Sequence, residues 1–300
     1  MISFSSFWHP LPKRHDRKEK KKNRFFVDFF LIKGKGLFGY LKNYLLLIKK
    51  IKHKEYDLIH AHYGLSGLLA TMQLYVPVII TFHGSDVNMK KNYIFSRIAS
   101  RLSTTNIFVH QSLPKKLKIY RNPIIIPCGF NNNRFFPLPK NKAREALKWE
   151  KNKHYIVFAS SFDNKIKNVQ LAKSAISNIN NCKLIELKGY EKEQINLILN
   201  ASDLLLVTSL SETGPIIVKE ALACNCPIVS TNVGDVQKLI HNVQNCYISS
   251  YNPKDIKKRI NQVFRNNKRT NGQQIIKNFN LENIAYKIID VYKKTLNNCI

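Results

Sequence analysis

The chain has 300 residues, and 44% of them are hydrophobic, so it can bury a sizeable core and is not an intrinsically disordered protein. Its 49 Lys and Arg residues against 19 Asp and Glu residues give a formal net charge of +30. Such a charge favours an anionic partner, whether nucleic acid, an anionic membrane face or a phosphorylated substrate. The length predicts two domains.

The cysteines show no disulfide-framework or Cys-x-x-Cys spacing, and they fall mostly in or beside apolar segments: Cys128, Cys182, Cys224, Cys226, Cys246 and Cys299. We interpret them as small core residues of a protein in a reducing cytoplasm. The sequence also contains no P-loop, which argues against an NTPase.

The first part of the chain predicts a basic, solvated run and then regular structure. Residues 1–8 are apolar but too few for a signal sequence or a membrane span, and residues 13–24 are strongly basic. Residues 24–32 predict a strand. Residues 34–54 predict an amphipathic helix whose apolar stripe is Leu37, Leu41, Leu45, Ile48 and Ile51. Such a helix could lie on an anionic membrane, but packing on the core is the favoured interpretation.

Strands and helices then alternate, with strands predicted at residues 57–62, 76–82 and 105–110. This alternation predicts a doubly wound parallel sheet, whose ligands bind beyond the carboxyl ends of the strands. His83 stands at such an end. His60 and His62 could ligate a metal, but no third ligand is visible, so one of them is expected to point into the core.

A second domain is predicted after Pro137 and Pro139, which with a short basic segment make a plausible linker. Strands are predicted at residues 154–160, 184–190, 204–207 and 227–229, and late helices at residues 256–264 and 281–296. The predicted division is residues 1–138, residues 139–280, and a final helix over residues 281–300.

The segment between the strands at 204–207 and 227–229 predicts an anion site. Pro215 suits the first position of a helix, and Gly214 before it leaves the loop flexible. The backbone N–H groups of Ile216 and Ile217 would then point free from the helix start. Glu212 and Glu220 bracket this point, although isolated glutamates are more often solvated.

Longer motifs resemble one known family. The segment 209–236 contains Glu-x7-Glu around the Gly-Pro helix start, then Glu-Ala-x-Ala-Cys and Pro-Ile-Val-Ser-Thr-x-Val-Gly-Asp-Val. It resembles the donor-site signature of the group 1 glycosyltransferases (family 4, retaining). Residues 81–86, Thr-Phe-His-Gly-Ser-Asp, are similar to the cleft motif of that family, and residues 124–137 are similar to its exit from the first domain.

The resemblance implies an α/β protein of the GT-B type, with two Rossmann-like domains of doubly wound parallel sheet facing a cleft. It assigns Glu220 to the ribose hydroxyls of a nucleotide-sugar donor, Glu212 to the donor sugar near its reacting carbon, and His83 to the sugar hydroxyls. Thr213, Gly214, Pro215, Ile216 and Ile217 form the expected donor loop and helix start.

In the same family an Arg and a Lys clamp the donor diphosphate. Lys167 matches the Lys, whereas Ser161 stands where the Arg is expected, so that half of the clamp is absent or supplied by Lys165. Gly189 and Tyr190 fall where the resemblance places the nucleobase pocket.

No two aspartates lie within two positions of each other, so the chain has no Asp-x-Asp motif to hold a metal–diphosphate. We therefore expect no metal and no cofactor, with the leaving group met by Lys167 and the amides of residues 214–217. Members of the family that the chain resembles begin with a strand and a glycine-rich loop, and residues 1–24 show no such pattern. The resemblance therefore predicts a chain truncated at its N-terminus.

The predicted function is a retaining glycosyltransferase that moves a sugar from a nucleotide-sugar donor to a glycan or lipid-linked acceptor in cell-surface polysaccharide synthesis. The expected location is the cytoplasm, with peripheral contact to the anionic inner face of the cell membrane. Two alternatives stay open. One is a catalytically degenerate homologue that binds the donor only. The other is a non-enzymatic binder of anionic membrane or nucleic acid, although no nucleic-acid recognition motif is seen.

Overall fold

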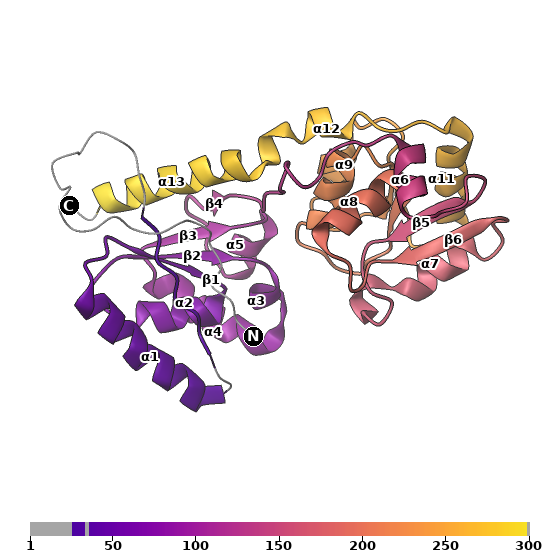
Figure 1. Ribbon diagram of the computed structural model, residues 1–300. Helices are drawn as coiled ribbons and strands as arrows, with labels where there is room; N and C mark the ends of the chain where they lie inside the picture. Colours follow the sequence, from indigo (N-terminus) through magenta and orange to yellow (C-terminus); the bar gives the residue numbers. More distant parts are fainter. Residues whose placement is uncertain (1–25, 34–35, 299–300) are drawn as a thin grey trace. The chain divides into compact units, whose positions relative to one another are not determined.

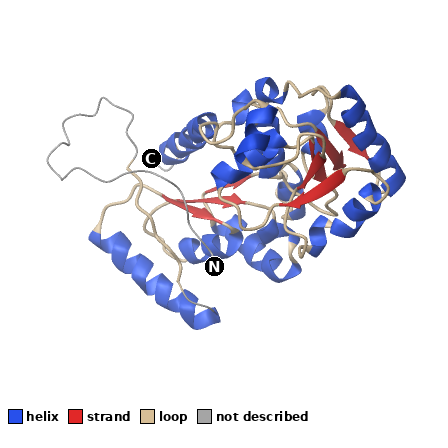
Figure 2. Ribbon diagram, turned by 45° about the vertical axis from the view of Figure 1, so that its right-hand side comes forward, coloured by secondary structure: helices blue, strands red, loops and turns tan. Residues whose placement is uncertain are grey.

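The computed structural model describes residues 26–33 and 36–298, and for residues 36–38 and 41 it describes the backbone only (Figure 1). The predicted apolar start and basic run lie outside these residues. The chain divides into two compact units: residues 1–125 with 291–300, and residues 126–290. Each unit holds one parallel sheet accompanied by helices (Figures 1 and 2).

The first unit contains, in chain order, α1 (Gly36–His53), β1 (Ile59–His62), α2 (Gly64–Thr71), β2 (Val78–Phe82), α3 (Ser85–Asn88), α4 (Lys90–Leu102), β3 (Thr105–Phe108), α5 (Ser112–Lys116) and β4 (Ile124–Ile125). Its strands pair in the order β1-β2-β3-β4, all in parallel. Successive crossovers in one direction place α2 and α4 on the same face of the sheet, where they pack on each other (Figure 1).

Two predictions for this unit are wrong. Residues 26–33 form no strand; Asp28 instead pairs with Lys50 of α1 and with Lys54, directly after that helix, at 3.1 and 3.0 Å. The helix itself is confirmed, but its core-facing side chains are Leu47 and Ile51, whereas Leu45 is 63% exposed. Of the predicted stripe, Ile51 is therefore confirmed as buried and Leu45 is wrong, and the buried face also includes the polar Asn43, which is bonded to the backbone of residue 33.

The second unit contains α6 (Lys140–Ala146), β5 (His154–Phe158), η1 (Lys165–Lys167), α7 (Val169–Ile176), β6 (Cys182–Glu186), α8 (Lys192–Ala201), β7 (Leu204–Val207), α9 (Ile216–Ala223), β8 (Ile228–Thr231), α10 (Val236–Ile240), β9 (Tyr247–Ser249), α11 (Pro253–Asn266), α12 (Gly272–Ile275) and η2 (Lys277–Phe279). Its strands pair in parallel in the order β6-β5-β7-β8-β9.

The core of this unit lies on both faces of its sheet. Val157 of β5 packs into one cluster, with Leu205 and Val207 of β7. Their neighbours in sequence, such as Phe158 and Leu206, pack into a cluster on the opposite face. Continuous apolar strands are expected where a parallel sheet is covered on both sides, so the short apolar runs of the sequence are explained by double burial.

The segment that leads into the second unit is packed rather than extended between domains. Phe130 and Phe135 belong to the core of the second unit. The amides of Phe136 and Leu138 donate hydrogen bonds to the side-chain oxygens of Asn196 and Asn200 on α8, at 3.2 and 2.8 Å. The last helix, α13 (Leu281–Asn297), begins in the second unit, and its residues from Val291 group with the first.

Candidate functional site

The sheet of the second unit reverses its strand order between β5 and β7, and this point brings together two predicted site residues. β6 lies on one side of β5, and β7 and β8 lie on the other. In open parallel sheets ligands bind at such a switch point, beyond the carboxyl ends of the strands. The loop after β5 carries Lys167 and the loop after β7 carries Glu212. The Lys167 ammonium donates to Glu212 Oε1 at 2.5 Å, and Ser209 Oγ donates to the same oxygen at 2.7 Å.

The predicted helix start follows directly. α9 begins at Ile216, so Pro215 is the N-cap residue (φ −67°, ψ 115°) rather than the first helical residue. A helix has no internal acceptors for its first amides, so the N–H groups at this end favour an anion. Gly234 (φ +57°) packs against the loop that leads into α9. A Cβ at position 234 would lie 2.6 Å from the Thr213 carbonyl oxygen, so only glycine fits there.

Glu220 lies within α9 and is 4% exposed. Its Oε1 accepts a hydrogen bond from Lys192 Nζ at 2.8 Å, at the start of α8. The Lys192 side chain is 48% exposed, so this cation has water on one side and a buried carboxylate on the other. Sequence reasoning missed Lys192. Its one visible signal is a basic residue at or just before the start of the helix that follows a strand; Lys167 likewise lies between β5 and α7.

The other predicted donor residues lie on the loops after β5 and β6. Lys165 opens η1 and is exposed, as are Gly189 and Tyr190. Ser161, which stands in place of the expected Arg, donates from Oγ to Asp163 Oδ1 at 2.6 Å. Asp163 also pairs with the exposed Lys188 at 2.7 Å, so the loops carry a further cation at this edge that the sequence did not single out.

A buried lysine lies next to Glu220 in α9. Lys219, directly before Glu220, is fully buried and donates to the carbonyl oxygen of Cys128 at 2.8 Å. Its ammonium lies 3.8 Å from Asp235 and 5.2 Å from the centre of the Phe279 ring. Burial lowers the pKa of Lys219, and the neighbouring Asp235 acts in the opposite direction. Lys219 thus fixes α9 to the segment that enters this unit.

In the first unit His83 lies at the carboxyl end of β2, as predicted. The loop after β2 turns at Gly84, whose φ of +108° is favourable for glycine and strained for any residue with a side chain. Asp86 accepts bonds from the amides of His83, Gly84 and Gly64, at 3.1, 2.8 and 3.0 Å. One buried carboxylate therefore ties the loop after β1 to the loop after β2, and burial raises its pKa.

His83 is part of a group of aromatic rings that the sequence did not predict. Its Nε2 lies 2.9 Å from His62 Nδ1, and the Tyr63 ring packs 4.6 Å from its own ring. Tyr63 has φ 68° and ψ 148°, a strained conformation for a residue with a side chain. Burial lowers the pKa of His62 and of His83 to about 4, and for His83 the neighbouring His62 contributes as well.

His60 is the histidine that points into packed surroundings, as predicted. Its two ring nitrogens lie 2.6 Å from Tyr292 Oη and 2.7 Å from Thr81 Oγ1. Burial, followed by the nearby His62, lowers its pKa well below the usual value. Within residues 26–33 and 36–298 no group of three or more His, Cys, Asp and Glu side chains is arranged to hold a metal ion. None of the helices described there combines the length and apolarity needed to cross a bilayer.

Comparison with known proteins identifies both halves of the chain. Residues 6–134 match the family model "Glycosyltransferase Family 4", and residues 172–280 match "Glycosyl transferases group 1". An uncharacterized glycosyltransferase of Methanocaldococcus jannaschii is 27% identical over 306 residues, covering 88% of this chain and 83% of that protein. The UDP-Gal:alpha-D-GlcNAc-diphosphoundecaprenol alpha-1,3-galactosyltransferase of Escherichia coli is 24% identical over 325 residues, covering 89% and 83%.

Among solved structures, the Anabaena protein HepE, determined in complex with UDP-glucose, superposes with a TM-score of 0.70 at 17% identity. The match covers 86% of this chain and 84% of HepE, and it supports the GT-B fold predicted from the sequence. With both family models in chain order, two parallel-sheet α/β units, and relatives aligned over most of their length, the chain belongs to the group 1 glycosyltransferases of family 4.

Proposed function

We propose that this glycosyltransferase moves a hexose from a UDP-linked donor to a lipid-linked glycan, with retention of anomeric configuration and without a metal ion. The observation that carries the proposal is the meeting of Lys167, Glu212 and the start of α9 at the strand-order reversal of the second unit. A cation, a carboxylate and free amides at one such edge suit a ligand that is both a sugar and a diphosphate.

The diphosphate is assigned to Lys167 and to the first amides of α9. In the free enzyme Lys167 is paired with Glu212, so its charge is neutralised and its ammonium is already held at the site. When the diphosphate arrives it takes up the ammonium as a stronger anionic partner, and Glu212 keeps its bond from Ser209. These fixed positive groups stabilise the charge that develops on the departing nucleoside diphosphate.

The nucleoside is assigned to Glu220 and to the loop after β6. A buried carboxylate can accept from both ribose hydroxyls, and before they arrive Glu220 accepts a hydrogen bond from Lys192. Gly189 and Tyr190 are exposed on the neighbouring loop, where they are available to a base, and Lys165 is available to the phosphates.

In the transfer step the bond between the anomeric carbon and the diphosphate oxygen breaks, and the acceptor hydroxyl oxygen bonds to that carbon on the same face. The departing phosphate oxygen takes the acceptor proton, so a protein general base is not required. Glu212 lies beside the Lys167 position, where a carboxylate can stabilise positive charge on the sugar ring. His83 is assigned to the sugar hydroxyls.

Two relatives support the substrate classes. HepE was determined with UDP-glucose, and the name of the E. coli relative specifies a UDP-sugar donor and a diphosphoundecaprenol acceptor. By analogy we assign a uridine diphosphate donor, a lipid diphosphate acceptor, and a cytoplasmic role at the inner face of the membrane in polysaccharide synthesis.

A thermal-shift screen of nucleoside diphosphates and nucleotide sugars tests the donor, because a ligand of the folded state raises the melting temperature. We expect UDP and one or more UDP-hexoses to raise it and UMP to raise it less. Incubating the stabilising donor with undecaprenyl-diphosphate-linked sugar acceptors then tests transfer. Donor binding without product from any such acceptor would favour the degenerate homologue, and failure to bind any nucleotide would refute the proposal.

A further inference from the structure

Helix α4 of the first unit turns its small side chains toward the core. Ser96 and Ala99 are fully buried, and Ser100 is 5% exposed. Gly64 of α2 comes so close that a Cβ there would lie 2.6 Å from Ser96 Cα. The two helices therefore pack at short range through small residues, and the core side of α4 has no room for a large apolar side chain.

The large apolar side chains of α4 point outward instead. Ile94, Ile98 and Leu102 recur every fourth residue and are 52%, 42% and 59% exposed, with Phe95 beside them at 39%. A helix on the surface of a globular protein normally buries such a stripe. This helix has the reverse pattern, and an exposed apolar stripe of this kind marks an interaction site.

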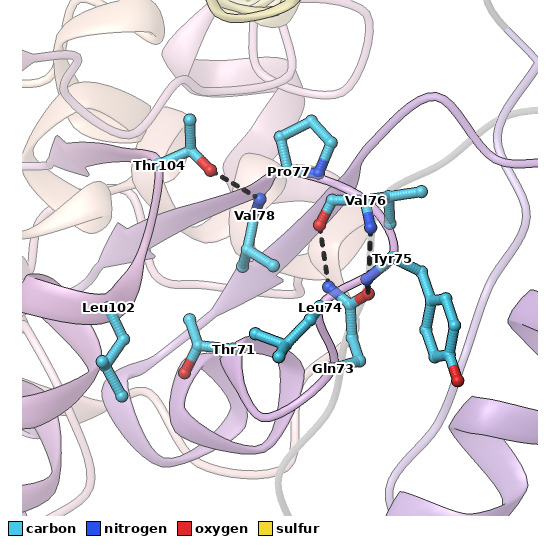
Figure 3. A pocket seen from close by; sticks show the side chains of 9 residues that line it. All are labelled: Thr71, Gln73, Leu74, Tyr75, Val76, Pro77, Val78, Leu102 and Thr104. Carbon is cyan, nitrogen blue, oxygen red and sulfur yellow. Dashed lines mark hydrogen bonds between the residues drawn. The ribbon is translucent and has the colours of Figure 1, made fainter. Parts of the chain in front are cut away.

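The stripe continues into a groove at the end of the helix. Leu102 lines a groove of about 340 Å³ together with Leu74, Tyr75 and Thr104 (Figure 3). Leu74 is 94% exposed and Tyr75 is 58% exposed. The loop that carries them is pinned, because Gln73 Oε1 accepts bonds from the amides of Tyr75 and Val76, at 2.9 and 3.1 Å. We call Ile94, Phe95, Ile98, Leu102, Leu74 and Tyr75 the α4 surface.

Charge decides which partner fits the α4 surface. The helix carries Lys90, Lys91, Arg97 and Arg101 and contains no acidic residue. Turning 100° per residue places Lys91 within the apolar stripe and Arg101 along its border. A second copy of the chain would bring two such sets of cations together on proteins that each carry a net charge of +30, which disfavours self-association.

We propose that the α4 surface docks the enzyme on an anionic lipid bilayer. Apolar side chains that enter the boundary between headgroups and acyl chains, flanked by Lys and Arg against anionic headgroups, form the pattern by which peripheral helices bind membranes. Nucleic acid would satisfy the cations but leave the aliphatic stripe in water. The proposal rests on the proposed function, since a lipid-linked acceptor is held in a bilayer. α4 begins shortly after His83, so the surface starts near that edge of the sheet.

Vesicle flotation with the full chain tests the proposal. We expect the wild type to float with vesicles that contain phosphatidylglycerol and not with pure phosphatidylcholine vesicles. Ile98→Ser with Leu102→Ser, and separately Lys91→Gln with Arg101→Gln, should each reduce binding to the anionic vesicles at least tenfold. The matched control is Lys254→Gln with Lys258→Gln, which removes the same charge from exposed positions on α11 and should retain binding.

Each other outcome contradicts the proposal: no flotation of the wild type, equal loss in the α11 control, or binding unchanged by both α4 variants. A dimer in sedimentation equilibrium that the Ile98→Ser and Leu102→Ser variant abolishes would assign the surface to self-association instead. UDP binding by calorimetry should be the same in the wild type and the α4 variants. A wild type that floats with anionic vesicles but binds no UDP would refute the donor assignment and leave the membrane surface standing.

Discussion

Glu220 is a buried carboxylate that accepts a hydrogen bond from the half-exposed Lys192. Glu220→Gln should weaken UDP binding by about 1.5–3 kcal/mol, the usual contribution of a hydrogen bond to a charged group. The fold should persist, because water can solvate the released Lys192. Calorimetry with a circular dichroism spectrum of each variant measures both effects. Lys192→Met serves as the comparison, and an unchanged UDP affinity in Glu220→Gln would remove Glu220 from the donor site.

Lys167 tests the diphosphate assignment. Lys167→Ala should weaken UDP binding more than UMP binding, because the second phosphate loses its charge-assisted bond. Lys165→Ala, on the same short helix but exposed, should have the smaller effect. EDTA should change neither the affinity nor the turnover. Strong inhibition by EDTA that manganese or magnesium restores would contradict the metal-independent mechanism.

The histidines of the first unit make its stability depend on pH. Burial lowers the pKa of His62 and His83 to about 4 from the usual 6.5, so between these values the unfolded chain binds protons that the folded chain does not. The free energy of unfolding should therefore be highest above about pH 6.5 and fall as the pH drops toward 4. His62→Asn, whose amide can replace Nδ1 beside His83, should lose less stability on acidification. Equal acid sensitivity in thermal melts of both proteins would contradict this.

At the scale of elements, the contact of α2 with α4 depends on Gly64. Gly64→Ala should destabilise the protein by about 1–3 kcal/mol, the usual cost of overpacking, because the added Cβ meets the backbone of Ser96. Lys91→Ala, on the outer side of α4, should change stability by less than about 0.5 kcal/mol. Urea unfolding measures both variants, and equal effects would show that the helices can separate without cost.

The elements of the second unit were the most predictable from sequence. The strands predicted at 154–160 and 204–207 from apolar runs are confirmed as β5 (His154–Phe158) and β7 (Leu204–Val207). The wrong strand at 24–32 has the same apolar pattern, but Asp28 pairs with Lys50 of α1 and with Lys54 after it, and residues 26–32 form no strand. Apolar periodicity also predicted that Leu45 would be buried, whereas Asn43 is buried instead. Which of the two faces the core depends on tertiary contacts.

The same limit applies to the candidate site. Glu212, Glu220 and Lys167 could be proposed from the sequence because motif spacing along the chain singles them out, and the structure places Lys167 beside Glu212. Lys192 and the pair of His62 with His83 depend on which loops meet at a sheet edge, and single-sequence patterns do not contain that information. The exposed apolar stripe of α4 could not be predicted for a related reason. The sequence shows a helical period, but it does not show which face of the helix is buried.

At the scale of the whole molecule, the nucleotide is assigned to the second unit alone. Lys167, Glu212, Glu220 and Lys192 all come from residues 126–290, with loops after β5, β6 and β7. In the same proposal His83 of the first unit is assigned to the sugar hydroxyls, and the α4 surface to the bilayer. The model "Glycosyl transferases group 1" matches residues 172–280, which lie within the second unit and include Lys192, Glu212 and Glu220.

Amide hydrogen exchange of the full chain, with and without saturating UDP, tests this central claim most directly. Bound ligand should slow exchange in residues 161–168, 188–192 and 209–220, because these segments carry the proposed donor contacts. Residues 71–78, which line the groove of the first unit, should be unaffected. Unchanged exchange in all three donor segments, or protection confined to the first unit, would contradict the assignment of the nucleotide to the second unit.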